Sequence, residues 1–320
     1  MSDSASSPKV TEGDYAWHVP GGAAVKTHYY MHHPTDTTTT ESKIPLLILH
    51  GGPGIPGVYL STLSKLHSHR PVIFYDQLGC ARSTRLPEKM GDEAFWTVDL
   101  FTRELDGVIA HLGLTEGGRQ FDLFGHSWGA MLAATYAAAN PTGSLSPRKL
   151  ILASGLASMA DWISEVNRLR RTMPREVQDV LDRCERNGTT DSKEYEEAVG
   201  HFYSLFMIKM DPMPADLAKA FELMGQDPTV YFTMFGRNEF SCNGPLKTWD
   251  MTSDLHKIVI PTLMTNGWYD EATDVVQRPF FHSIPRVKWV QFADSAHMAH
   301  IEEEERYLQV VEDFLSAKAV

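Results

Sequence analysis

The chain has 320 residues, 42% of them hydrophobic and 22% charged, which is the composition of an ordinary globular protein. Its formal net charge of −12 at pH 7 argues against nucleic acid as a partner, because phosphate binding needs an excess of Lys and Arg. No apolar run approaches the ~20 residues that span a bilayer, and the first residues lack the apolar segment of a secretory signal.

The first half of the chain alternates predicted strands and helices. Short apolar runs that end at polar and glycine residues, as in "KIPLLILHGG" and "RPVIFYDQLG", are typical of strands buried on both faces of a parallel sheet. Residues 101–114 have helical spacing, and residues 119–141 pass from a strand through a glycine-flanked turn into an Ala-rich helix. Further strands are predicted at 148–155, 256–267 and 287–294, with a final helix at about 303–318. This order predicts an α/β fold with a mostly parallel central sheet.

The alternation stops between residues 156 and 244. Four helices are predicted there, at 161–173, 174–188, 192–210 and 214–225, with Pro and Gly between them. We interpret residues 156–244 as a helical cap domain inserted into a core made of 1–155 and 245–320. Most aromatic and Met side chains of the cap are expected to pack its own core, and a few to line a cleft at the seam. The candidates are Phe202, Tyr203, Phe206, Met207, Tyr231, Phe232 and Phe235.

The sequence "GHSWG" at 125–129 fits the G-x-S-x-G pattern of a nucleophile elbow. Both flanking positions of such a turn need glycine, because a Cβ would clash. An apolar strand precedes this motif and a helix of small residues follows it, so the match is in the right structural context. We therefore predict that Ser127 is a nucleophile.

A serine nucleophile needs a base and an acid that orients the base. His297 follows the final predicted strand, and we prefer it to His300, which is expected beyond the apex of the same loop. Asp270 follows a buried strand and a turn, whereas Asp274 is well explained as a helix-capping acid. The H-x-x-H spacing of the two histidines suggests a metal, but no third ligand has fitting spacing, so neither metal nor cofactor is expected.

The glycine-rich stretch "HGGPG" at 50–54 comes directly after a predicted strand. Glycines allow the backbone to approach a reacting carbonyl, and an amide there can face the negative charge that develops on its oxygen. We expect the backbone N–H groups of Gly52 and Trp128 to form an oxyanion hole.

These motifs together resemble the prolyl aminopeptidase (proline iminopeptidase) family of serine peptidases, which have the α/β-hydrolase fold. The resemblance covers nearly the whole chain, through "LHGGPG", "FYDQLGCARS", "GHSWGAMLAATYA", "GRNEFSCNGPLKTWD", "IPTLMTNGWYDEAT" and "SAHM". It implies the same triad of Ser127, Asp270 and His297. It also implies that Glu271 and Glu239 hold the α-ammonium group of the substrate.

The chain departs from the family pattern at Ala81, since "DQLGCARS" carries alanine where the family usually has glycine. The extra methyl group is expected to tighten or shift this loop near the active site. Cys80 in the same loop is interpreted as structural. The 3 cysteines lie far apart without a C-x-x-C pair, so we expect reduced thiols and a cytoplasmic protein.

The resulting hypothesis is a hydrolase that releases an N-terminal residue, with proline favoured, from a small peptide or amide with a free amino terminus. An amino-acid amide or ester hydrolase, or a hydrolase in small-molecule biosynthesis, would use the same triad and remains an alternative. An esterase or lactonase would leave Glu239 and Glu271 without a role, and a non-catalytic binding protein would not need the triad.

Overall fold

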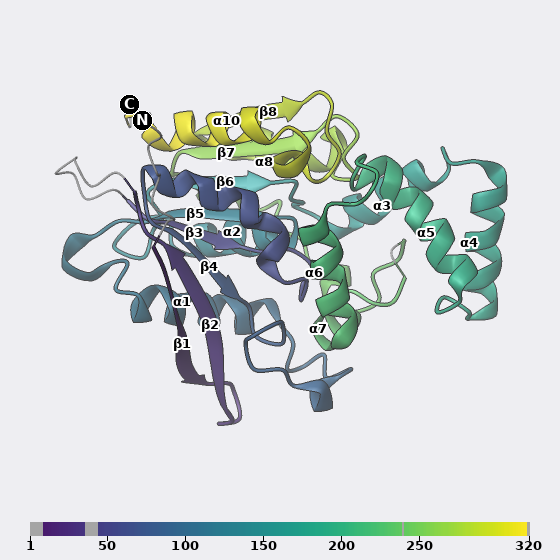
Figure 1. Ribbon diagram of the computed structural model, residues 1–320, viewed down its shortest axis with the longest axis horizontal. Helices are drawn as coiled ribbons and strands as arrows, with labels where there is room; N and C mark the ends of the chain where they lie inside the picture. Colours follow the sequence, from purple (N-terminus) through teal and green to yellow (C-terminus); the bar gives the residue numbers. More distant parts are fainter. Residues whose placement is uncertain (1–8, 36–43, 239, 319–320) are drawn as a thin grey trace, which may run out of the picture.

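The computed structural model describes residues 9–35, 44–238 and 240–318, which form a central sheet with helices on both faces (Figure 1). Among these residues, one sheet has the strand order β1-β2-β4-β3-β5-β6-β7-β8. The strands from β3 to β8 pair in parallel, as predicted. Their bounds are Leu46–Leu49 (β3), Val72–Asp76 (β4), Asp122–His126 (β5), Leu150–Ala153 (β6), Thr262–Gly267 (β7) and Val287–Phe292 (β8).

An antiparallel hairpin extends one edge of the sheet, and the sequence did not predict it. β1 (Val10–His18) pairs with β2 (Ala24–His32), and β2 pairs antiparallel with β4. The turn between them contains Gly21 and Gly22, whose φ angles of 96° and 88° favour glycine. Most side chains of β1 are exposed or half-buried, so the hairpin lacks the continuous apolar run that marks the central strands.

Side chains alternate between two apolar layers along each central strand. Leu47 and Leu49 pack on the face that carries α1 (Val98–His111), α2 (Trp128–Ala139) and α8 (Asp274–Ser283). Leu46 and Ile48 pack on the other face, against the 3₁₀ segment η1 (Gly57–Ser68) and α10 (Glu304–Ser316). A short helix, α9 (Ala299–Glu302), precedes α10. Both faces of the sheet are therefore covered, which explains why the central strands β3 and β6 consist of apolar residues alone.

Among the described residues between β6 and β7, five α-helices stand beyond one end of the strands (Figure 1). They are α3 (Met159–Arg170), α4 (Arg175–Asn187), α5 (Lys193–Phe206), α6 (Ala215–Gln226) and α7 (Thr229–Met234). The hydroxyl groups of Ser158 and Ser192 cap α3 and α5, and Gly188 ends α4 in the left-handed conformation. We call α3 to α7 the cap helices; the boundaries of a cap domain at 156 and 244 stay a prediction.

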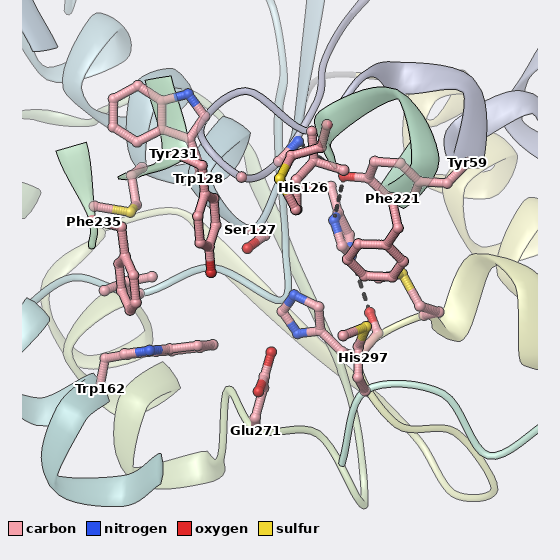
Figure 2. Close-up of a pocket in the computed structure, with 18 of the residues that line it drawn as sticks. Tyr59, His126, Ser127, Trp128, Trp162, Phe221, Tyr231, Phe235, Glu271 and His297 are labelled. Carbon is pink, nitrogen blue, oxygen red and sulfur yellow. Dashed lines mark hydrogen bonds between the residues drawn. The ribbon is translucent and has the colours of Figure 1, made fainter. Parts of the chain in front are cut away.

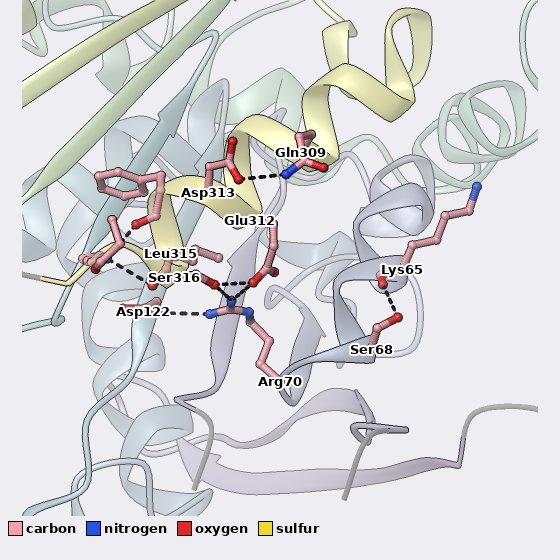
Figure 3. Close-up of polar contacts among 12 residues, drawn as sticks. Lys65, Ser68, Arg70, Asp122, Gln309, Glu312, Asp313, Leu315 and Ser316 are labelled. Atoms are coloured by element: carbon pink, nitrogen blue, oxygen red, sulfur yellow. Dashed lines mark hydrogen bonds and ion pairs between the residues drawn. The ribbon is translucent and has the colours of Figure 1, made fainter. Parts of the chain in front are cut away.

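The C-terminal helix is held against the sheet by buried cations (Figure 3). Arg70 donates to Glu312 at 2.6 Å and lies 3.8 Å from Asp122 at the start of β5. Lys149 donates to the carbonyl oxygens of Phe314 and Leu315 at 2.6 and 3.0 Å. A cation at the C-terminal end of a helix is favourable because the last carbonyl groups carry partial negative charge. These contacts fix α10, which follows the loop that carries His297.

The three cysteines all lie in the described part of the chain, where each is buried and none forms a disulfide. This agrees with the prediction of reduced thiols. None of the described helices combines the length and the apolar character that crossing a membrane requires.

Glu104 on α1 is a fully buried carboxyl group. The Thr27 hydroxyl donates to its Oε1 at 2.5 Å, and the backbone N–H of Leu78 donates to the same atom at 2.8 Å. Burial disfavours the charged form and raises the pKa of Glu104 to about 8, although both hydrogen bonds oppose the shift. The folded protein therefore binds a proton here that the unfolded chain releases at much lower pH.

This proton predicts a pH dependence of stability. Because the pKa of Glu104 is higher in the folded state, its contribution to the free energy of unfolding falls as the pH rises from about 5 to about 8. Gln cannot ionise, so wild type should lose stability relative to Glu104→Gln across this range. Urea titrations at several pH values measure the difference, with the exposed Glu88→Gln as control. Parallel curves for wild type and Glu104→Gln would contradict the assignment.

Candidate active site

Ser127 occupies the tight turn between β5 and α2 (Figure 2). Its backbone has φ 54° and ψ −119°, a strained conformation for a residue other than glycine. A Cβ on Gly125 would lie 2.1 Å from the carbonyl oxygen of Gly129, and a Cβ on Gly129 would lie 2.2 Å from that of Leu49. Both glycines of the motif are thus required by backbone contacts, as the sequence predicted.

His297 and Asp270 form a buried pair at the carboxyl ends of β8 and β7. The Nδ1 atom of His297 lies 2.7 Å from Oδ1 of Asp270. The backbone N–H of Ala272 donates to the same oxygen at 2.7 Å, and that of Gly267 donates to Oδ2 at 3.4 Å. With Nδ1–H directed at the carboxylate, Nε2 of His297 is left as the basic nitrogen. Figure 2 shows the His297 ring next to the Ser127 side chain.

The two competing residues have other contacts. The Nε2 atom of His300 lies 3.2 Å from the backbone oxygen of Tyr59, and burial lowers the pKa of His300 to about 3. Asp274 begins α8 and accepts a hydrogen bond from Gln291 at 2.6 Å. Neither lies in the pair that faces Ser127, which favours His297 and Asp270 over these alternatives.

The two expected oxyanion donors, Gly52 and Trp128, line the same cavity as Ser127. Gly52 has φ 110°, and a Cβ there would lie 2.6 Å from the backbone nitrogen of Ile55. Trp128 is the first residue of α2, where a backbone N–H lacks an acceptor within the helix. Within residues 9–35, 44–238 and 240–318, neither N–H has a hydrogen-bond acceptor. Both amides are available to a substrate oxygen.

Gln77 joins the segments that carry these two amides, a role that the sequence analysis missed. Its side chain donates to the His50 carbonyl oxygen at 3.0 Å and accepts from the Trp128 indole N–H at 2.9 Å. Its backbone N–H donates to Nε2 of His50, also at 3.0 Å. The only sequence signal was the presence of Gln77 in the "DQLG" motif, which named no partner.

Glu271 lines the cavity and is 4% exposed. Its carboxylate points into the cavity that Trp162 also lines (Figure 2), whereas Asp270 lies against the His297 ring. The neighbouring acids therefore point in different directions, as expected, although the chain bends at Glu271 and Ala272 and is not extended there. The backbone N–H of Glu271 donates to the carbonyl oxygen of Phe206 at 3.1 Å, which ties this loop to the end of α5. Glu239 lies outside the described residues.

The cavity has a volume of about 190 Å³ and lies between the sheet end and the cap helices. Four of the cap side chains considered in the sequence analysis line it: Tyr203, Met207, Tyr231 and Phe235. Most of the remaining wall is also apolar and includes the methionines Met131, Met159, Met224 and Met298. Ser127, His297 and Glu271 are thus polar groups converging in a largely apolar cleft, which is typical of a small-molecule site.

Comparison with known proteins agrees with this arrangement. The family model for the alpha/beta hydrolase fold matches residues 44–304. A proline iminopeptidase of Heyndrickxia coagulans is 38% identical over 279 residues, covering 85% of this chain and 91% of that protein. The chain belongs to the proline iminopeptidase family. It is therefore a hydrolase of an aminopeptidase family, in agreement with the resemblance of its motifs.

Solved structures support the family assignment over the full fold. The crystal structure of VinJ has a TM-score of 0.87 and 38% identity, covering 97% of this chain and 99% of that one. A proline iminopeptidase from Mycobacterium smegmatis has a TM-score of 0.83 and 35% identity, with coverage of 94% and 97%. The cap helices are included in these alignments, since nearly the whole chain is covered.

Ala81, where the family usually has glycine, has φ 44°. This left-handed conformation is the physical reason for glycine at that position. Neighbouring Cys80 is buried, its Sγ lies 3.4 Å from Nε2 of His50, and burial raises the pKa of its thiol well above the usual value. A buried, protonated thiol packed behind the oxyanion loop agrees with the structural role expected for Cys80.

Ala81→Gly is therefore predicted to stabilise the protein. Glycine relieves the strain of the left-handed conformation in the folded protein, but it also increases the conformational entropy of the unfolded chain. Because the first effect is larger, the free energy of unfolding should rise by about 0.5–1 kcal/mol. The control is Ala218→Gly on the exposed face of α6, which should lower the same quantity by about 1 kcal/mol. Urea denaturation of both variants measures the signs. A loss of stability in Ala81→Gly would show that the methyl group makes compensating contacts.

Proposed function

We propose that this protein releases an N-terminal amino acid, with proline preferred, from a small peptide or amide that has a free amino terminus. The observation that carries the proposal is the buried His297–Asp270 pair at 2.7 Å, of which His297 lines one cavity with Ser127 and Glu271. The names of the similar proteins supply the preference for proline, because the cavity wall alone does not select one apolar residue.

In the proposed reaction, Ser127 Oγ attacks the carbonyl carbon of the N-terminal residue while Nε2 of His297 takes the hydroxyl proton. Asp270 keeps the imidazole in the required tautomer and stabilises its charged form. The N–H groups of Gly52 and Trp128 bind the tetrahedral oxyanion. His297 then protonates the leaving amine, and a water molecule, deprotonated by His297, hydrolyses the acyl-enzyme.

Glu271 supplies the selection for a free amine. Its carboxylate lies in a cavity whose wall is mostly apolar. A substrate ammonium group that pairs with the carboxylate compensates both charges for the hydration that they lose there. An N-acetylated substrate has no such charge and cannot form this ion pair. Glu239 is proposed to hold the same ammonium group from the family resemblance. The net charge of −12 favours a cationic substrate over an anionic one.

A second candidate is the hydrolysis of amino-acid amides or esters, including a step in small-molecule biosynthesis. The methionine-rich wall of the cavity favours a broad range of substrates, because flexible thioether side chains adapt to apolar groups of different shape. The triad and the role of Glu271 would be unchanged, and only the leaving group would differ.

A panel of aminoacyl p-nitroanilides tests the function. We expect turnover of free prolyl p-nitroanilide, little or no turnover of its N-acetylated form, and none by Ser127→Ala, which removes the nucleophile. If another residue with a free amino group is preferred, the aminopeptidase reaction is supported and the preference for proline is rejected. Equal turnover of free and acetylated substrates, or activity in folded Ser127→Ala, would reject the proposed mechanism.

Glu271→Gln tests the ammonium site separately. The variant should raise KM for free-amine substrates about tenfold with a smaller change in kcat, since a hydrogen bond to a charged group contributes about 1.5–3 kcal/mol. Steady-state kinetics on the prolyl substrate gives both constants. Glu222→Gln, on the exposed surface of α6, makes the same charge change away from the cavity and serves as control. A kcat/KM within about twofold of wild type, or ~0.4 kcal/mol, would contradict the role of Glu271.

A further inference from the structure

A buried chain of hydrogen bonds joins the oxyanion loop to the loop of His297. The backbone N–H of Gly51 donates to the Tyr59 hydroxyl oxygen at 2.8 Å. That oxygen lies 2.9 Å from Nδ1 of His126, and Nε2 of His126 lies 3.0 Å from the carbonyl oxygen of His297. Figure 2 shows the contacts on both sides of His126. Tyr59 and His126 are 2% and 1% exposed, so water does not replace these contacts.

Chemistry fixes the direction of every bond in this chain. The carbonyl oxygen of His297 can only accept, so Nε2 of His126 must carry a proton. A neutral imidazole has one ring proton, which makes Nδ1 of His126 an acceptor. The Tyr59 hydroxyl must then donate to Nδ1 and accept from the N–H of Gly51. Every donor in this chain therefore faces an acceptor, and only one arrangement of the protons allows this.

The surroundings keep His126 neutral, as this arrangement requires. Burial lowers the pKa of His126 well below its usual value, and the neighbouring rings of His297 and His300 act in the same direction. Their ring centres lie 4.8 and 5.1 Å from that of His126. A charged ring at this position would also repel the imidazolium that forms on His297 during the proposed reaction.

We propose, resting on the proposed function, that Tyr59 and His126 are positioning residues that hold the His297 backbone at a fixed place relative to the oxyanion loop. His126 directly precedes Ser127, so the chain of bonds passes through the nucleophile turn and joins three parts of the reaction site. Small displacements of such groups slow turnover strongly. Glu271 takes no part in the chain, so substrate affinity should change little when the chain is broken.

A second donor makes the proposal testable without unfolding the loop. The Ser154 hydroxyl donates to the same carbonyl oxygen of His297 at 3.2 Å. This bond remains when Tyr59 or His126 is replaced, so the carbonyl group keeps one partner. Ser154 has no link to Gly51, however, and cannot maintain the spacing between the two loops.

The first variant is Tyr59→Phe, which removes the hydroxyl group and leaves the ring in place. We expect kcat for the prolyl substrate to fall about tenfold and KM to stay within about twofold, because two buried polar groups lose their partner. Tyr75→Phe is the matched control, since Tyr75 is also fully buried and its hydroxyl has no partner among the described residues. Equal kcat values for the two variants would overturn the proposal.

A pair of variants at His126 separates positioning from packing. Gln has an amide N–H that can donate to His297 and an oxygen that can accept from Tyr59, whereas Leu fills similar space with neither group. We expect His126→Gln to recover most of the kcat that His126→Leu loses, at a temperature where both are folded. Equally impaired Gln and Leu variants would mean that the ring acts only through packing, against the proposal.

Labelling by a fluorophosphonate distinguishes this proposal from the proposed function. The reagent reacts with an activated serine and needs His297 and the oxyanion donors, but no ammonium group or proline ring. One outcome is that the wild type cleaves no aminoacyl substrate but Tyr59→Phe is labelled more slowly than Tyr75→Phe. This outcome would support the positioning role and reject the proposed function. The other outcome is that Tyr59→Phe is labelled at the wild-type rate and the wild type cleaves the prolyl substrate. This outcome would reject the positioning role and uphold the proposed function.

Discussion

The rest of the site depends on the close packing of the backbone of residues 125–129, both within the turn and against the end of β3. Gly125 and Gly129 are needed because a side chain at either position would enter a neighbouring peptide group. This contact forces Ser127 into its strained conformation and starts α2 at Trp128. It also brings the turn against the strand that leads into the oxyanion loop. The proposed nucleophile and the proposed oxyanion donors are therefore placed by this close backbone packing, and the remaining residues of the candidate site lie around it.

The adjacent acids Asp270 and Glu271 have similar burial but different surroundings. Asp270 accepts hydrogen bonds from two backbone amides and faces the imidazole of His297, so its charge is compensated within the protein. Glu271 faces a cavity whose lining is largely apolar. Two neighbouring acids thus lie in different environments, one against the imidazole of His297 and the other at the cavity wall.

Much of the fold and the main catalytic candidates could be predicted because their signals are local. Glycine spacing marks the turn at Ser127, and unbroken apolar runs mark the buried strands. The β1–β2 hairpin lacked such a run, and α7 has only 6 residues, too few to show helical periodicity. The contacts of His126 could not be predicted either. Its partners lie 67 and 171 positions away in the sequence, and no local pattern encodes a hydrogen bond across the fold.

The bond between the Glu271 N–H and the Phe206 carbonyl oxygen connects the loop of both acids to the end of α5. The positions of Asp270 and Glu271 therefore depend on the packing of a cap helix as well as on the strand that precedes them. A substitution in the cap that displaces the end of α5 would also reach the acid that pairs with His297.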